Sequence, residues 1–168
     1  MSTQTWANLT ESSVQRWVGS LENMYTWYRQ HEDRIEKPSI DLSKPLDVDK
    51  IFMSSMEQVK KAGLSDEFAA RLKTHGYADS QVWVNDSTAI TKALLASSFG
   101  KTNMSAEQLN QQILTLRNSQ LPEAQKRMLE QVLMMSAGVA ANTDGVSQED
   151  IKLVSPYRAQ VMRILASQ

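Results

Sequence analysis

The chain of 168 residues contains no cysteine, and this absence excludes the widest range of chemistry. Disulfide scaffolds, thiolate zinc sites, iron–sulfur clusters and thiol nucleophiles all depend on cysteine. A chain of this length is expected to form one domain and to bury about 70% of its unfolded surface. Its stability therefore needs neither disulfides nor metals.

Other features are also scarce. No run of about 18 apolar residues occurs, so we predict no membrane span. The 18 Lys and Arg nearly balance the 19 Asp and Glu, giving a net charge of -1. This balance leaves no basic footprint for nucleic acid, and we predict no nucleic-acid partner. Only 6 glycines and 4 prolines interrupt the chain, and strand-like alternation is poor.

Helical periodicity is present almost everywhere. The first helix is predicted to begin after Thr10 and to run to about Asp33. Its apolar residues follow the i, i+3, i+4, i+7 pattern and share one stripe, namely Val14, Trp17, Val18, Leu21, Met24, Tyr25 and Tyr28. The next segment, residues 35–46, contains Pro38 and Pro45 and is predicted to be a loop, because each proline disfavours helix in the preceding residue.

Capping residues divide the rest of the chain into further helices. The predicted starts are Asp47 or Asp49, Ser65, Asp79 or Ser80, Ser105 with Gln108, Pro122, and Ser147. Near the end, Ser155-Pro156 either kinks the last helix or restarts it. We predict an all-α fold: a single globular domain, residues 1–168, of about seven helices packed as an irregular bundle, with an N-terminal tail at 1–9.

The first and sixth predicted helices carry the strongest apolar stripes, so we expect them to form the centre of the domain. Between Val132 and Ala141 the sixth helix is apolar nearly all round, which predicts burial on several sides. Four of the 9 methionines lie on apolar stripes and are expected to fill the core: Met24, Met56, Met128 and Met135.

A search for chemical motifs returns little. None of the common nucleotide-binding, metalloprotease, hydrolase or calcium-binding motifs is present. His31 has acidic neighbours at 32, 33 and 36, but adjacent helical residues do not share a face, so we predict no metal site there. His75 precedes a glycine at a predicted helix end, where it can bond the last carbonyls. We predict no catalytic residue and no cofactor.

The segment 72–83 has the order helix, glycine turn, helix, which resembles a DNA-binding helix-turn-helix. Its second helix carries Asp86 and has no arginine to reach bases or phosphates. A structural role for this segment is therefore the better interpretation.

Three large hydrophobic residues lie off their apolar stripes: Trp27, Val84 and Met134. Such a residue is either covered by another helix or exposed for a partner. We take these three as candidate contact residues for a protein partner. Trp27 is the foremost of them because interfaces favour tryptophan.

Several short segments occur in a recognisable order. They are Leu9-Thr10-Glu11 with Val14-Gln15-Arg16-Trp17; His75-Gly76-Tyr77-Ala78-Asp79-Ser80 with Trp83; Pro122-Glu123-Ala124-Gln125-Lys126; and Val154-Ser155-Pro156-Tyr157-Arg158. This order resembles a family of small, largely uncharacterised, all-helical bacterial proteins that are exported to the periplasm. The resemblance implies that Met1 replaces a removed signal peptide and that the protein is periplasmic or secreted; otherwise it is expected to be cytoplasmic. It implies no activity.

Our leading hypothesis is a non-enzymatic, soluble interaction or adaptor module, periplasmic by the resemblance, that binds a protein partner through a helical face. The alternative is a carrier of a small apolar ligand in an inter-helix cavity, and an enzyme of unrecognised type comes third. A closed apolar cavity of at least several hundred Å³ would favour the carrier. A full core with Trp27 exposed in a flat apolar patch would favour the adaptor. The sequence leaves the oligomeric state open.

Overall fold

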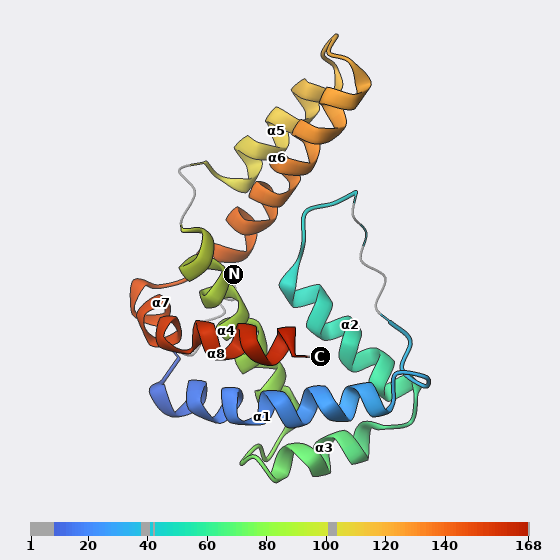
Figure 1. The fold of residues 1–168 in the computed structure, drawn as a ribbon, viewed down its shortest axis with the longest axis vertical. Coiled ribbons are helices and arrows are strands. Elements are labelled where there is room, and N and C mark those ends of the chain that lie inside the picture. Colours follow the sequence, from blue (N-terminus) through green and yellow to red (C-terminus); the bar gives the residue numbers. More distant parts are fainter. Residues whose placement is uncertain (1–8, 38–40, 42, 101–103, 168) are drawn as a thin grey trace, which may run out of the picture.

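The computed structural model describes residues 9–37, 41, 43–100 and 104–167 (Figure 1). The helices are α1 (Glu11–Gln30), α2 (Val48–Lys61), α3 (Ser65–Lys73), α4 (Ser80–Phe99), α5 (Ala106–Arg117), α6 (Glu123–Thr143), α7 (Gln148–Val154) and α8 (Arg158–Ala166). The 3₁₀ turn η1 (Ser155–Tyr157) joins α7 to α8 without a gap. The predicted all-α fold is confirmed, and no strand occurs within the described residues.

The predicted helix starts are largely confirmed by their capping bonds. The Thr10 hydroxyl accepts from the Ser13 amide at 3.1 Å, and the Ser13 hydroxyl accepts from the Thr10 amide at 3.0 Å. Ser105 and Gln108 form a reciprocal capping box of the same kind. Asp47, Asp79 and Ser147 cap α2, α4 and α7.

Three boundaries differ from the prediction. Helix α1 ends at Gln30, three residues earlier than expected. Ser65 is the first residue of α3 rather than its cap, and Leu64 in the cap position makes no side-chain bond. Pro122 lies at the cap of α6 instead of its first helical position. At Ser155-Pro156 the chain tightens into η1, because proline offers no backbone donor to continue the α-helical ladder.

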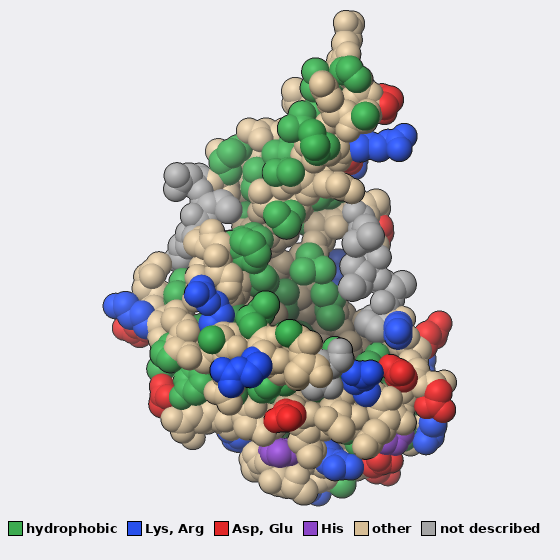
Figure 2. Space-filling model, viewed as in Figure 1, with side chains coloured by type: hydrophobic (Ala, Val, Ile, Leu, Met, Phe, Trp, Pro, Cys, Tyr) green, Lys and Arg blue, Asp and Glu red, His purple; other side chains and the backbone are tan. Residues whose placement is uncertain are grey.

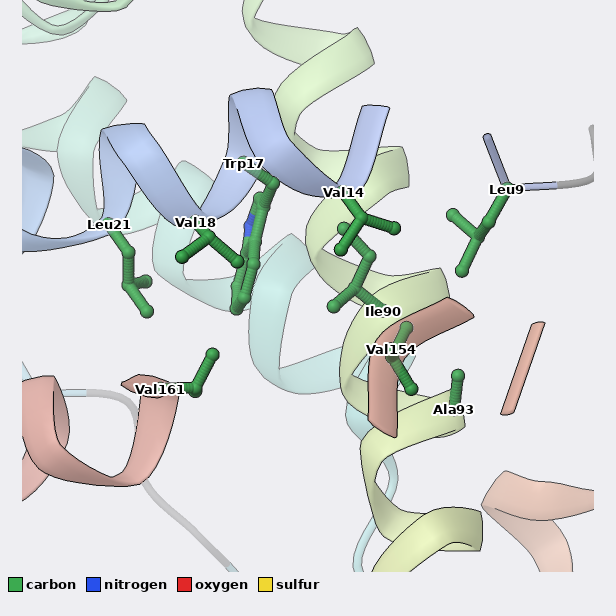
Figure 3. Close-up of a cluster of buried hydrophobic side chains, with 9 residues drawn as sticks. All are labelled: Leu9, Val14, Trp17, Val18, Leu21, Ile90, Ala93, Val154 and Val161. Carbon is green, nitrogen blue, oxygen red and sulfur yellow. The ribbon is translucent and has the colours of Figure 1, made fainter. Parts of the chain in front are cut away.

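Helices α1 and α4 form the centre of the domain (Figure 3). Val14, Trp17, Val18 and Leu21 point from one face of α1 toward side chains of α4, α7 and α8. The members supplied by those helices are Ile90 and Ala93, Val154, and Val161. The expectation that α1 is central is confirmed, and α4 takes the place that we expected for α6.

The prediction that residues 132–141 of α6 are buried on several sides is wrong for the first part of that segment, residues 132–136. Helices α5 and α6 form a hairpin that projects from the body (Figure 1). One face of α6 packs on α5 through Leu133, Ala137 and Ala140 against Leu109. Only the last turns of α6, from Ala137 onward, are buried on several sides. The core role predicted for Met128 and Met135 is wrong for the same reason, since both are exposed.

The base of the hairpin is fixed to the segment that leads into α2. The Asn142 side chain accepts from the Val48 amide at 2.9 Å and donates to the Leu46 carbonyl at 2.6 Å. Gly138, one turn earlier, allows the Leu46 backbone to approach α6 closely. Part of the predicted 35–46 loop, residues 38–40 and 42, lies outside the described residues, as does the tail at 1–8. Ile35, at the start of this loop, is buried in the core.

Candidate functional site

An exposed apolar stripe runs along the projecting half of α6. Met128, Val132 and Met135 are 61%, 54% and 60% exposed. Their spacing of four and then three residues is the heptad spacing by which one helix receives another. Figure 2 shows hydrophobic side chains gathered along the hairpin and continuing into the hollow at its base. We call Met128, Val132 and Met135 the α6 seam.

The α6 seam has uncharged borders. Gln125, Gln131 and Ser136 lie beside it in the helical order, and Val139 continues it into the buried base of the hairpin. Glu130 turns toward α5, where it forms an ion pair with Arg117. The residues directly beside the seam are therefore uncharged, whereas Arg127 and Glu130 lie farther round α6 and line a neighbouring groove.

Beside the α6 seam lies a groove of about 410 Å³ between α6 and the segment before α2. Ser43, Lys44 and Leu46 form one wall, and Arg127, Glu130, Gln131, Met134 and Met135 form the other. The structure thus places Met134, a candidate from the sequence, in a half-buried position on this wall. Of the three candidates, it is the one that remains accessible.

Trp27 is not an exposed contact residue, which corrects its foremost place among the candidates. It is only 1% exposed, because α3 covers the face of α1 from which it projects. Its ring contacts Phe68 with centroids 5.4 Å apart, and its indole nitrogen donates to Glu67 at 2.7 Å. The other interpretation of an off-stripe residue, coverage by a neighbouring helix, is the one that holds.

Val84 needs the same correction, since it is 6% exposed. Helix α4 contacts α1, α2, α3, α6 and α7, so it buries residues on more than one side. An off-stripe apolar residue on such a central helix has no route to the surface. Conversely, Val82 of the same helix is 40% exposed.

A second feature, an aromatic pocket of about 200 Å³, opens between α1, α2, α3 and α4. Its lining is almost wholly apolar and comprises Leu21, Met24, Tyr25, Tyr28, Phe52, Ser55, Met56, Val59, Phe68 and Trp83. Trp83 meets Phe68 and Phe52 edge-on, at interplanar angles of 83° and 85°. The pocket is open and smaller than the closed cavity of several hundred Å³ that the carrier hypothesis required.

Two polar clusters lie elsewhere on the body. His31 donates from Nδ1 to the Trp27 carbonyl at 2.9 Å, and its Nε2 lies 3.3 Å from Glu67. His31 of the segment after α1 thus pairs with Glu67 of α3. His75 follows α3, and its buried Nε2 has no hydrogen-bond partner, so this nitrogen does not make the expected bond to the last carbonyls of α3.

The second cluster joins Arg16, Tyr77 and Asp86. Arg16 bonds Asp86 at 3.1 Å and lies 4.2 Å over the Tyr77 ring, while the Tyr77 hydroxyl donates to Asp86 at 3.0 Å. Burial, reinforced by the Asp86 charge, raises the pKa of Tyr77 well above its ordinary value. This phenol therefore serves as a neutral hydrogen-bond donor that ties α4 to the turn after α3.

Among the described residues, no group of three or more His, Asp or Glu side chains is arranged to hold a metal ion. Each helix in the same part of the chain is too short or too polar to cross a bilayer. No family model matches the chain, and comparison with the curated proteins and with the solved structures finds no match.

The sequence contained the residues of the α6 seam, but their apolar pattern was interpreted as core. A signal against that interpretation was available in α5, which offers few apolar residues to cover a helix that is apolar on all sides. The aromatic pocket had no comparable signal, because its lining comes from four helices that only the tertiary structure brings together.

Proposed function

We propose that this protein is a non-enzymatic interaction module that binds a helix of a protein partner along the α6 seam. The observation that supports the proposal is the exposure of Met128, Val132 and Met135 at heptad spacing on a projecting hairpin. Exposed apolar stripes of this kind are typical of surfaces that receive an amphipathic helix.

The chemistry and length of the surface support a helical partner. The exposed part of α6, residues 123–135, is about 20 Å long at 1.5 Å per residue, which suits a partner helix of three to four turns. Methionine is flexible and polarisable, so the two methionines of the seam can adapt to the side chains of a partner. The uncharged borders favour a partner whose own seam is flanked by uncharged or weakly polar residues.

The proposal is tested by photo-cross-linking in cells of the source organism. A benzophenone amino acid at position 132 is expected to give one reproducible adduct, identified by mass spectrometry as a partner or as a second copy of this chain. The same amino acid at Gln111, which is exposed on α5, is the positional control. Equal adduct patterns from positions 111 and 132 would contradict the proposal.

A matched pair of substitutions sharpens this test. With the cross-linker moved to position 128, Val132→Asp is expected to abolish the adduct, because a carboxylate cannot be buried unpaired in a helix–helix seam. Val82→Asp introduces the same carboxylate at a 40% exposed site on the body and is expected to leave the adduct unchanged. Loss of the adduct in both variants would contradict the assignment of the α6 seam as the binding surface.

The location of the protein belongs to the same proposal. The resemblance of its short segments to exported bacterial proteins supports a periplasmic location. Two experiments test the periplasmic location: determination of the coding sequence upstream of Met1, and fractionation of the cells. A native Met1 without an upstream signal sequence, together with recovery in the cytoplasmic fraction, would contradict it.

A further inference from the structure

The aromatic pocket lies far along the chain from the α6 seam and on other helices, so it is a separate site. It gathers five of the eleven aromatic residues of the protein around a space of about 200 Å³. Met24, Val59 and Phe68 are 3%, 3% and 5% exposed and form its inner wall. Tyr25, Tyr28, Phe52 and Met56 are half-buried around it.

The size of the pocket restricts what it can hold. An apolar cavity of about 150 Å³ accommodates a benzene molecule, whereas sites for drug-sized ligands have volumes of roughly 300–1,000 Å³. A space of about 200 Å³ therefore fits one or two fused rings and is too small to enclose an acyl chain or a large cofactor.

The chemistry of the walls restricts the ligand further. Ser55 is the one hydroxyl-bearing aliphatic residue of the lining, and it donates to the Ile51 carbonyl of its own helix at 2.8 Å. No charged side chain lines the pocket, so a charged ligand would lose its hydration without compensation. Burial raises the pKa of Tyr28, and this phenol remains neutral and able to donate to a polar tip of the ligand.

We propose that this pocket binds a small, neutral aromatic molecule of about the size of indole. The steep angles between Trp83, Phe68 and Phe52 present both ring edges and ring faces to the space, and aromatic pairs favour such edge-to-face contacts. Ser55 keeps the space open, since a larger apolar residue at this position of α2 would fill it. The two tyrosines suit a ligand that carries a single polar group, such as an N–H or a hydroxyl.

The methionines of this chain provide the test. In protein labelled with ¹³C in the methionine methyl groups, titration with indole is expected to shift the Met24 and Met56 signals saturably, because ring currents act at short range. Met128, Met135 and Met162 are exposed elsewhere and serve as internal controls. Single methionine-to-leucine variants assign each signal. Shifts of all exposed methionines without saturation, or no shift up to the solubility limit of indole, would overturn the proposal.

Substitutions at one position separate binding from folding. Ser55→Leu is expected to fill the pocket and weaken indole binding about tenfold or more, a loss of at least 1.4 kcal/mol. Ser55→Ala leaves the space open and is expected to bind as the parent does. Ser98→Leu makes the same change at an exposed position of α4 and is the matched control.

Retained binding in Ser55→Leu, with an unchanged far-UV spectrum, would show that indole sits elsewhere. Should Ser55→Leu fail to fold, Val59→Ile, which adds one methylene to the inner wall, is expected to weaken binding in a folded protein; unchanged binding there would count against the site. None of these results depends on the hairpin, so the two proposals can fail separately.

Discussion

The indole nitrogen of Trp17 donates to the hydroxyl of Ser87 at 2.8 Å, and the reverse arrangement joins the same two helices one turn away. There, Trp83 of α4 donates to Ser20 of α1 at 3.0 Å. Each serine passes its own proton to the carbonyl of the tryptophan on its own helix, at 2.7 Å in both cases. The buried indole of Trp17 and the half-buried indole of Trp83 thus satisfy their N–H groups across the α1–α4 interface, which fixes the register of the central pair.

This reciprocal bonding predicts a cost for Ser87→Ala. The change leaves the buried Trp17 N–H without an acceptor and should lower the free energy of unfolding by about 1–3 kcal/mol. Ser98→Ala, at an exposed position of the same helix, should change it by less than about 0.5 kcal/mol. Urea denaturation followed by circular dichroism measures both variants. Equal stability of the two would mean that the Trp17–Ser87 bond contributes nothing.

Gly138 and Gly19 form a second matched pair. A Cβ at Gly138 would lie 3.1 Å from the Leu46 backbone nitrogen, so Gly138→Ala should displace the segment that Asn142 holds and cost about 1–3 kcal/mol. At Gly19 a Cβ meets nothing within 4 Å, and Gly19→Ala should stabilise α1 by about 0.5–1 kcal/mol. Thermal and urea unfolding test the opposite signs. A stabilising Gly138→Ala would show that the hairpin base is loosely packed.

Because the α6 seam is exposed, we predict that shortening one of its side chains costs little stability. Val132→Ala should change the free energy of unfolding by less than about 0.5 kcal/mol, since the side chain is already 54% exposed. Val161→Ala, at a 3% exposed site on α8, should cost about 2 kcal/mol through lost burial and a residual cavity. Comparable losses in both variants, measured in dilute monomeric protein, would mean that the seam is covered.

The raised pKa of Tyr77 predicts that the protein loses stability at alkaline pH. Its pKa is raised in the folded state above the ordinary value of 10.0, first by burial and then by the Asp86 charge. The neutral phenol is therefore favoured by folding, and its contribution is full below pH 10 and is lost as the pH rises through the folded pKa. Urea unfolding at pH 8 and pH 11 measures this loss.

Tyr77→Phe supplies the comparison for that measurement. It should be less stable than the parent at pH 8, because the bond to Asp86 is gone, and should lose less stability between pH 8 and pH 11. If Tyr77→Phe and the parent lose the same amount of stability between pH 8 and pH 11, groups other than Tyr77 cause the loss.

The helices themselves could be predicted from local chemistry. Thr10, Asp47, Ser105 and Ser147 begin helices because each supplies a side-chain oxygen to an unpaired amide only three residues away. The inner face of α1 followed from its 3.6-residue periodicity in the same way. Such signals act within one or two turns, so they can be read without knowledge of neighbouring elements.

The sites could not be predicted in this way. An apolar stripe shows which face of a helix gains free energy from burial, but it does not show whether a neighbouring helix covers that face. Trp27 was covered by α3, whereas Met128, Val132 and Met135 were left uncovered because α5 occupies a different face of α6. The assignment of core and surface was therefore reversed at these positions.

The amino-acid sequence by itself determined that this Cys-free chain is all-α and where most of its helices begin. It also determined which classes of reaction the composition excludes. These properties depend on residue type and on contacts within a few residues. The tertiary structure alone decided that α4 is central, that α5 and α6 project, and that rings from four helices surround one open pocket. These outcomes depend on which apolar faces of helices distant in the chain pack against one another, and the local sequence does not specify that pairing.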